Sequence, residues 1–325
     1  MIIINLKCGL GNQLFQYSTG KAIAKMKGTT LKLYKDPINL DEEWFGLDKF
    51  VEELDFISED EVDFFISGVK KEKGLINWFV DFVRKNRILL FLARRLRSSK
   101  IIKLPSSDGV FDNRKVFLED DRVDWTLSFR KDIFLVDKDC FLRGFFSSYK
   151  YFDFIKEDLI EELSTLKVPL SDIGRDVKSH IESVNSISVH IRRGDAVSID
   201  EVSLWYKGII NREYYKKAIN YFLDRIEDPV FFIFSNDMDW VRENFNLPEN
   251  YRLVDHNDAD HGYEDLYLMS CCQNNITTGF SSFAWWAAYL NRNPNKIVLR
   301  AREACGIEKY NYPEDYYPAD WIVVE

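Results

Sequence analysis

The residues best suited to chemistry lie in segment 186–195, where a β-branched run ends in His-x-Arg-Arg-Gly-Asp. The run predicts a buried parallel strand, and open α/β sheets bind their ligands beyond the carboxyl ends of such strands. The adjacent guanidinium groups of Arg192 and Arg193 can pair bidentately with phosphate oxygens. The purely structural alternative is an ion pair of either arginine with Asp195. By itself, the motif predicts an anion site.

A second anion site is indicated by segment 277–286, where a strand leads through a glycine to Ser281 and Ser282 at the start of a helix. Unpaired N–H groups and the helix dipole attract phosphate to such a position. The alternative is that one of these serines is a plain N-cap. Trp285 and Trp286 are predicted to pack in the core rather than to form a sugar platform.

Asp265 opens another predicted helix, and its carboxylate could accept the two adjacent N–H donors of a guanine edge. The alternative is a favourable first-turn acid. Segment 258–260 is formally an Asp-x-Asp pair, the type that holds a divalent ion beside a sugar-nucleotide diphosphate. Asx turns explain this turn-rich stretch equally well, and His256 and His261 lack the helical spacing of a metal pair. We expect no metal, because guanidinium groups can neutralise a diphosphate leaving group.

The elements that must position these residues form an α/β pattern. Residues 2–6 predict a strand, 7–12 a glycine-rich turn, 13–27 a helix that ends at Gly28, and 30–34 a second strand. This βαβ opening indicates a parallel sheet. The Gly-x-Gly of the turn lacks the third glycine of a dinucleotide-binding fingerprint.

The second half of the chain repeats the pattern more clearly, after a strand predicted from residue 140 and a helix over 151–166. The expected strands and helices alternate along the chain: strand 187–191, helix 212–225, strand 230–235, helix 238–245, strand 251–255, helix 264–272, strand 275–278, helix 282–290 and strand 296–299, which closes the sheet. A break at 168–172 sets the domain boundary, which predicts an N-terminal domain over 1–168 and a C-terminal domain over 169–325. Two such domains facing across a cleft would place the glycine turn opposite the arginines.

Composition excludes several classes of protein. Hydrophobic residues make up 46% of the 325 residues and charged residues 30%, which is typical of a folded chain. The net charge of −9 argues against nucleic acid as a partner. Five cysteines without CxxC spacing argue against a disulfide framework or a zinc site and fit a reducing compartment. We expect no signal peptide and no membrane-spanning helix, and thus a cytoplasmic protein.

Segment 70–100 differs from the rest of this acidic chain. It carries ten Lys and Arg residues against two acidic ones, with aromatic and aliphatic residues between them. A basic helix of this kind could lie on an anionic membrane surface. The alternative is the solvated face of a core helix.

Taken together, these motifs resemble those of the α-1,2-fucosyltransferase family, glycosyltransferase family 11. Residues 9–17 are similar to its G-L-G-N-Q-[ML]-F-Q-Y signature and residues 190–195 to its H-x-R-R-G-D motif. Segments 234–237, 265–270 and 281–286 follow in the family's order. This chain departs from the family pattern at Cys8, Ser147 and Phe280, and none of these departures affects the arginines.

The resemblance implies a GT-B fold of two Rossmann-like domains and a metal-independent, inverting enzyme with no cofactor and GDP-fucose as donor. It also implies the site residues, namely Arg192 at the β-phosphate with Arg193 in support, His190 and Asp265 at guanine, Ser281, Ser282 and Phe283 at the diphosphate, and Gly11, Asn12 and Gln13 at fucose and the acceptor. Arg192 and Asn12 are candidates for the chemical step. Asp195 is the nearest candidate base, with Asp200 and Glu201 as alternatives.

The expected reaction is transfer of fucose to the 2-hydroxyl of a terminal galactoside on a surface glycan or a lipid-linked oligosaccharide. Segment 70–100 would bring the enzyme to the inner face of the membrane. One alternative is a glycosyltransferase of the same fold with a different linkage or donor. The other is a non-catalytic protein that binds a nucleotide or a glycan.

Overall fold

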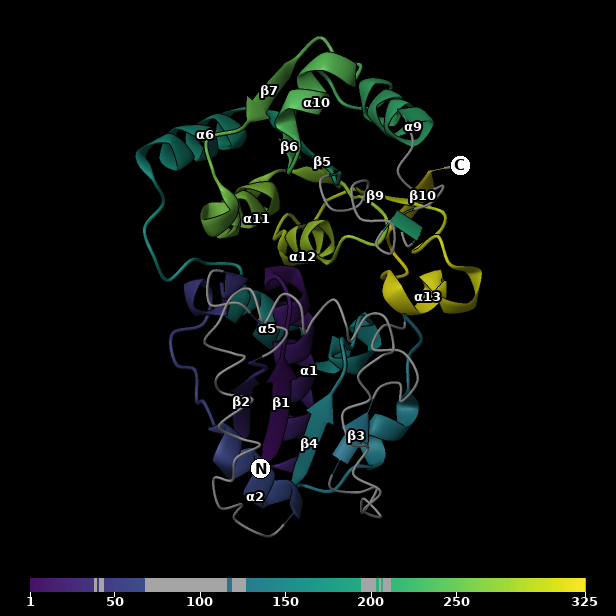
Figure 1. Ribbon diagram of the computed structural model, residues 1–325. Coiled ribbons are helices and arrows are strands. Elements are labelled where there is room, and N and C mark those ends of the chain that lie inside the picture. Colours follow the sequence, from purple (N-terminus) through teal and green to yellow (C-terminus); the bar gives the residue numbers. More distant parts are fainter. Residues whose placement is uncertain are drawn as a thin grey trace.

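The computed structural model describes residues 1–37, 40, 44–67, 116–118, 127–193, 203–204, 206 and 212–324. Two parallel β-sheets lie in separate halves of the molecule, with helices around each (Figure 1). The N-terminal sheet comes from residues 2–143 and the C-terminal sheet from residues 185–324. The prediction of an α/β fold of GT-B type, with two Rossmann-like units, is confirmed.

The N-terminal sheet has the strand order β2-β1-β4-β3. Its strands are β1 (Ile2–Leu6), β2 (Leu31–Lys35), β3 (Val116–Leu118) and β4 (Cys140–Arg143). Every residue of β1 is buried, as expected for a central parallel strand that is covered on both faces. All the pairings are parallel.

Helix α1 (Leu10–Lys27) connects β1 to β2 and begins three residues earlier than predicted. The extended backbone of Gly9, with φ −71° and ψ 168°, caps the helix, so the expected turn is shorter. Gly28 ends the helix in the left-handed region, at φ 61°. Half of the predicted turn, residues 10–12, is therefore the start of α1.

The remaining elements of the N-terminal unit are short. They are η2 (Leu47–Lys49), α2 (Glu59–Ser67), η3 (Lys131–Leu135), η4 (Tyr149–Tyr151), η5 (Asp153–Ile155) and α5 (Lys156–Leu163). The prediction of one helix over 151–166 is wrong for its first part. Phe152 leaves the helical region at φ −136° and ψ 7°, and it separates two 3-10 turns before α5 begins.

The C-terminal sheet has the strand order β10-β9-β8-β5-β6-β7. Its strands are β5 (Asn185–Ile191), β6 (Pro229–Ser235), β7 (Tyr251–Val254), β8 (Asn274–Ile276), β9 (Val298–Ala301) and β10 (Ile322–Val324). The helical elements of this half are α6 (Asp172–Ser183), α9 (Arg212–Leu223), α10 (Met238–Asn244), η6 (Ala259–His261), α11 (Gly262–Cys271), α12 (Ser282–Leu290), η7 (Glu308–Tyr310) and α13 (Pro313–Tyr316). The prediction that the strand near residue 298 closes the sheet is wrong, because β10 pairs outside β9.

The strand orders locate the ligand site. In the C-terminal sheet the chain moves from β5 to β6 and β7 on one side and then returns to β8 on the other. The N-terminal sheet likewise has β2 on one side of β1 and β4 on the other. Crevices form at the carboxyl ends of strands where the order reverses in this way. The loops after β1, β4, β5 and β8 are therefore the expected walls of a site.

The two units meet through aromatic side chains of α1 and α12. The ring of Phe15 lies 4.5 Å from that of Trp285 and 5.3 Å from that of Trp286, centroid to centroid. The indole N–H of Trp285 donates to the carbonyl of Tyr316 at 2.9 Å. Trp285 and Trp286 are 1% and 0% exposed, which confirms that they are core residues. This buried aromatic contact holds α12 against α1.

The structure does not test several of the predictions. The boundary at 168/169 stays a prediction. Segment 70–100, Asp195, Asp200 and Glu201 lie outside the described residues, so the membrane contact and the base stay predictions too. Within the described ranges, no helix is both long enough and apolar enough to cross a bilayer.

Candidate functional site

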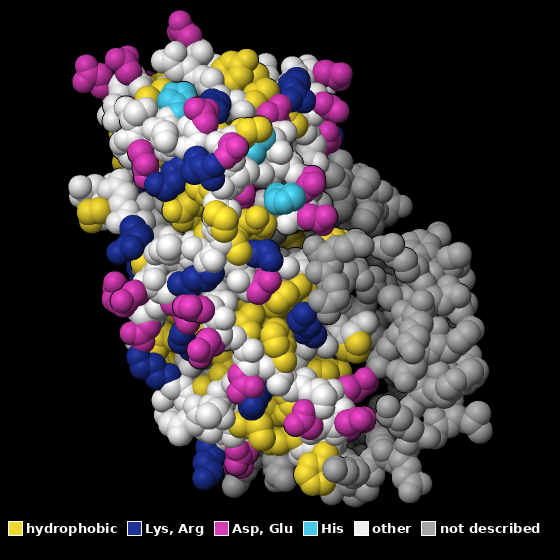
Figure 2. All heavy atoms as spheres, turned by 90° about the vertical axis from the view of Figure 1, so that its left-hand side faces the viewer, with side chains coloured by type: hydrophobic (Ala, Val, Ile, Leu, Met, Phe, Trp, Pro, Cys, Tyr) yellow, Lys and Arg dark blue, Asp and Glu magenta, His cyan; other side chains and the backbone are white. Residues whose placement is uncertain are grey.

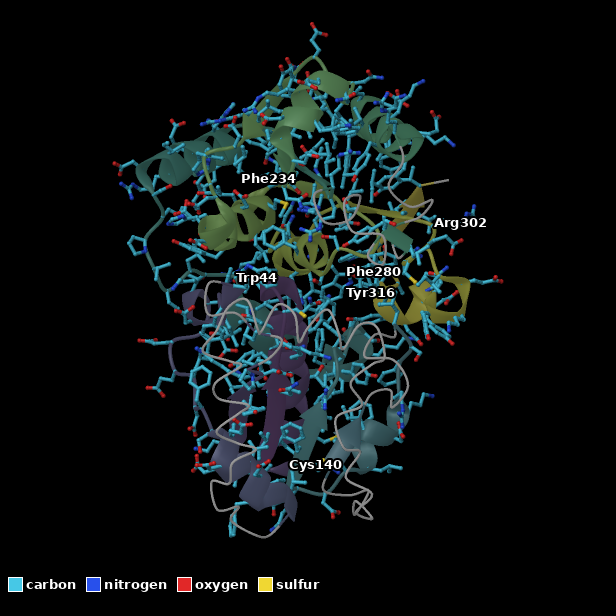
Figure 3. The ribbon with its side chains drawn as sticks, viewed as in Figure 1. Trp44, Cys140, Phe234, Phe280, Arg302 and Tyr316 are labelled. Carbon is cyan, nitrogen blue, oxygen red and sulfur yellow. The ribbon has the colours of Figure 1, made fainter. Side chains whose placement is uncertain are left out.

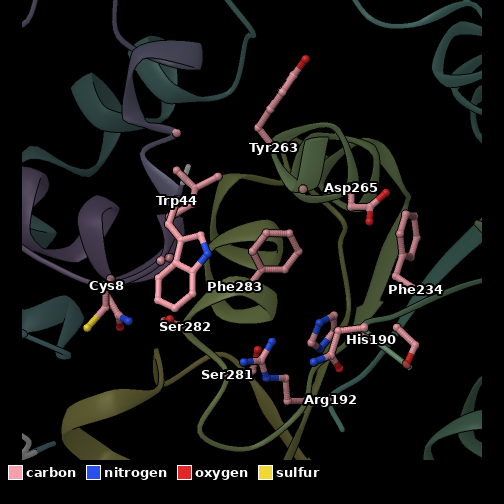
Figure 4. Close-up of a pocket in the computed structure, with 18 of the residues that line it drawn as sticks. Cys8, Trp44, His190, Arg192, Phe234, Tyr263, Asp265, Ser281, Ser282 and Phe283 are labelled. Carbon is pink, nitrogen blue, oxygen red and sulfur yellow. The ribbon is translucent and has the colours of Figure 1, made fainter. Parts of the chain in front are cut away.

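A cavity of about 970 Å³ lies between the two units (Figure 4). This volume is within the range of small-molecule sites. Loops from both sheets line it, as the reversal of strand order predicts. The sequence-predicted residues on its wall are Gly11, Asn12, His190, Arg192, Asp265, Ser281, Ser282 and Phe283. The fold thus brings together residues that are up to 272 positions apart in the sequence.

Arg192 and the start of α12 form the part of the wall suited to an anion. Arg192 directly follows β5, and Figure 4 shows its side chain beside Ser281. The Ser281 hydroxyl accepts from the amide of Ala284 at 3.3 Å, so the plain N-cap interpretation is confirmed for this serine. Its hydroxyl hydrogen can still be donated. The guanidinium and the positive end of α12 both favour a phosphate here.

The face shown in Figure 2 carries both charge signs. Its Lys and Arg side chains are interspersed with Asp and Glu over the coloured surface. Among the described residues of that face, neither sign of charge gathers in one large area. On the cavity wall, the groups that favour an anion are Arg192 and the start of α12.

His190 lies behind Arg192 and is 5% exposed. Burial lowers the pKa of His190 to about 3, and the charge of Arg192 acts in the same direction. The imidazole is therefore neutral at pH 7. Its Nδ1 lies 3.4 Å from the Thr278 hydroxyl oxygen, and its ring lies 5.7 Å from that of Phe283. A neutral imidazole can donate or accept one hydrogen bond without adding charge next to the arginine.

Buried hydroxyl groups hold the ends of β5 and β8 together beneath this wall. The Tyr215 hydroxyl lies 3.0 Å from the carbonyl oxygen of His190 and 2.7 Å from the Thr278 hydroxyl oxygen. Thr278 also donates to the same carbonyl. Because Arg192 follows His190 directly, this network sets the direction in which the chain leaves the sheet.

Asp265 lies in the first turn of α11, across the cavity from His190 in Figure 4. Burial raises the pKa of its carboxyl to about 7, while the amide of Asn257, which donates to it at 2.7 Å, acts in the opposite direction. The negative charge of Glu264 adds to the upward shift. A carboxyl that titrates near neutrality is ready to ionise when a ligand presents two N–H donors.

Gly11 allows the backbones of the two units to touch at the floor of the cavity. A Cβ at this position would lie 2.6 Å from the Phe283 nitrogen and 2.6 Å from the Ser282 carbonyl carbon. Both of these are backbone atoms that cannot rotate away. The glycine thus permits the starts of α1 and α12 to converge at the cavity.

Of the predicted site residues in described positions, two do not line the cavity. Arg193 lies with its Nε 3.3 Å from the Asp237 carboxylate and with its guanidinium carbon 3.8 Å from the centre of the Trp240 ring. Gln13 is fully buried and donates to the carbonyl oxygens of Cys8 and Trp44 at 2.7 and 2.8 Å. The side chains of both residues hold neighbouring elements in place, and their predicted direct contact with the donor stays a prediction.

The Asp-x-Asp segment forms the predicted turn. The Asp258 carboxylate accepts from the amides of Asp260 and His261, both at 3.1 Å, and it lies 2.7 Å from the His261 ring nitrogen. The Asx interpretation is confirmed. Across the described ranges, no group of three or more His, Cys, Asp or Glu residues has the geometry of a metal site.

Sequence reasoning missed several aromatic residues on the cavity wall. Figure 3 shows Trp44, Phe280 and Tyr316 at the level where the units meet, far from Cys140 at the base of β4. Tyr263 also lines the cavity. A Trp after three consecutive acids, in a segment without a helical or strand pattern, was the available signal for Trp44.

Comparison with known proteins identifies the family. The model of glycosyl transferase family 11 matches residues 86–325, which is most of the chain. The chain belongs to glycosyl transferase family 11. This family 11 glycosyltransferase is 29% identical over 310 residues to the O-antigen biosynthesis glycosyltransferase WbnK of Escherichia coli, covering 92% of this chain and 93% of that protein.

Two further relatives differ in the sugar that their names specify. An α-1,2-colitosyltransferase of Escherichia coli is 28% identical to this chain over 334 residues, and the alignment covers 100% of this chain and 99% of that protein. Galactoside α-(1,2)-fucosyltransferase 1 of Aotus azarae is 31% identical over 159 residues, which is 46% of this family 11 chain and 42% of the relative. The solved fucosyltransferase NodZ from Bradyrhizobium is 13% identical at a TM-score of 0.43, with 88% of this chain and 91% of that chain covered. This likeness carries no inference about function.

Proposed function

We propose that this protein transfers L-fucose from GDP-fucose to the 2-hydroxyl of a terminal galactoside, with inversion at the anomeric carbon and without a metal. The observation that supports this most is the cavity wall, where Arg192 lies beside Ser281 at the start of α12, His190 lies next to Arg192, and Asp265 lies beyond His190. A diphosphate beside Arg192 leaves the guanine end of the nucleotide toward Asp265. The sugar then extends toward the N-terminal unit, where Gly11 and Asn12 lie.

The chemistry follows from charge. The acceptor oxygen forms a bond to C1 of fucose from the face opposite GDP, and the bond from C1 to the β-phosphate oxygen breaks. Its electron pair leaves on the diphosphate, where Arg192 and the α12 terminus stabilise the developing negative charge. The acceptor hydroxyl gives its proton to a base. Asp195 remains our first choice for that base, with Asp200 and Glu201 as the alternatives.

A different sugar is the second candidate. The colitosyltransferase relative covers the whole chain, whereas the galactoside fucosyltransferase covers less than half of it. The same cavity would then accept colitose rather than fucose on the nucleotide. Competition between GDP-fucose and GDP-colitose for a limiting amount of enzyme separates the two proposals.

The test is a GDP-release assay with GDP-fucose, a β-galactoside and EDTA. We expect turnover in the wild-type protein and a loss of about 10²–10³-fold in kcat for Arg192→Ala, the usual cost of removing such a partner. Arg175→Ala is the matched control, because Arg175 lies in an exposed ion pair on α6. Equal rates for Arg192→Ala and the control would contradict the proposal.

A further inference from the structure

Trp44 is the most exposed of the five tryptophans in described positions. Its exposed fraction is 52%, whereas Trp285, Trp286 and Trp321 are at most 4% exposed. It nonetheless lies on the cavity wall. Figure 4 shows its indole beside Phe283, on the side of the cavity formed by the N-terminal unit. The ring is therefore open to whatever occupies the cavity.

The backbone around Trp44 is fixed by the start of α1. The buried amide of Gln13 donates to the Trp44 carbonyl at 2.8 Å and accepts from the Gly46 amide at 3.2 Å. Phe45, between them, also lines the cavity but is partly buried, with its ring 5.9 Å from that of Phe56. Trp44 is thus the more exposed of the two aromatic residues in this loop. A flat apolar surface held in this way loses little conformational entropy when a ligand binds.

The position of Trp44 assigns it to the acceptor. The charged wall formed by Arg192 and the α12 terminus lies on the C-terminal unit, and Trp44 faces it from the other unit. A diphosphate gains nothing from an indole face. A pyranose does, when one of its faces carries C–H groups rather than hydroxyls. The axial 4-hydroxyl of galactose leaves the C–H groups of C3, C4 and C5 on one such face.

We propose that Trp44 is the stacking platform for the galactose ring of the acceptor and that it selects galactosides over glucosides. This inference rests on the proposed function for the direction of the donor and for a galactoside as the acceptor. When the C–H face of galactose lies on the indole of Trp44, the hydroxyl groups at the edge of the sugar ring point into the cavity. The reacting hydroxyl can then face the anomeric carbon of the donor.

The test measures acceptor binding without turnover and, in a separate assay, the acceptor KM. Saturation-transfer NMR of methyl β-galactoside with the GDP-bound protein is expected to give the strongest signals at H3, H4 and H5. We expect Trp44→Ala to abolish these signals and to raise the acceptor KM at least tenfold, with the GDP Kd changed less than twofold. Trp44→Phe keeps a flat ring and is expected to recover part of the binding. Methyl β-glucoside is expected to give weak signals with every variant.

Phe154→Ala is the matched control, because Phe154 is 55% exposed in the same unit and does not line the cavity. Unchanged galactoside signals and KM in Trp44→Ala would overturn the inference while leaving fucosyl transfer intact. Trp44-dependent galactoside signals without any transfer from GDP-fucose would support the inference and contradict the proposed function.

Discussion

Replacing Asp265 with asparagine is expected to stabilise the free protein and to weaken its binding of GDP. In the unfolded chain this carboxyl ionises near its ordinary pKa of 3.8, whereas in the folded protein burial raises the pKa to about 7. The folded state therefore holds a proton that the unfolded state has released. As pH rises from about 4 to 7, this difference progressively destabilises the fold, and above pH 7 the cost is constant.

The size of the effect follows from the two pKa values. A difference of about three pKa units corresponds to about 4 kcal/mol of unfolding free energy, which is an upper bound because the cavity side of Asp265 is open to water. Asparagine has no proton to lose and can still accept the hydrogen bond from Asn257. The variant should thus gain little at pH 4 and about 2–4 kcal/mol at pH 8.

Urea unfolding of wild type and Asp265→Asn at pH 5, 6, 7 and 8 measures this gain. Asp239→Asn is the matched control, because the Asp239 side chain is 94% exposed. Calorimetric titration of GDP at pH 8 should show a loss of about 10–100-fold in affinity, because the guanine donors lose a charged acceptor. A stability gain that does not vary with pH, or a variant less stable than wild type at pH 8, would refute this reasoning.

Three other substitutions test the parts that position the site. Tyr215→Phe removes the hydroxyl shared by the ends of β5 and β8 and should cost about 1–3 kcal/mol in urea unfolding; an unchanged midpoint would contradict this. Gly11→Ala should lower both the GDP affinity and the melting temperature, because the added Cβ would collide with the backbone at the start of α12. Gly9→Ala is the control and should be tolerated, because a Cβ there meets open space. Equal effects of the two substitutions would argue against the close approach of the two helices. Cys8 has a positive backbone angle, φ 62°, which strains a residue with a side chain but not a glycine. In thermal melts, Cys8→Gly should therefore stabilise the protein by about 1 kcal/mol, while Cys8→Ala should not. Equal gains in both variants would show that backbone strain is not the cause.

The sequence predicted the chemistry-bearing half of the site because of where its motifs fall. His190 lies near the end of β5 and Arg192 directly follows it, while Ser281 lies in the loop after β8. Parallel strands present their carboxyl ends at the same edge of a sheet. β8 has only three residues, but the clear helical pattern of α12 follows it. β10 also has three residues, and only the four-residue helix α13 precedes it, so this strand was missed.

The other half of the site could not be read from local pattern. Trp44 lies in a segment with no periodicity, and it reaches the cavity because Gln13, 31 positions away, binds its backbone. Arg193 looks equivalent to Arg192 in sequence, yet it turns toward Asp237 and Trp240. Which of two adjacent arginines faces a ligand depends on neighbours from β6 and α10. Only the folded arrangement supplies that information.

The most direct measurement is the structure of the product formed from GDP-fucose and a β-galactoside by the purified protein in EDTA. NMR of the isolated product reports the position and the anomeric configuration of any new linkage. We predict an α-linked fucose on O2 of galactose, which is absent when Arg192→Ala replaces the wild type. A fucose on another hydroxyl, a β-linkage, or a requirement for a divalent ion would contradict the proposed reaction.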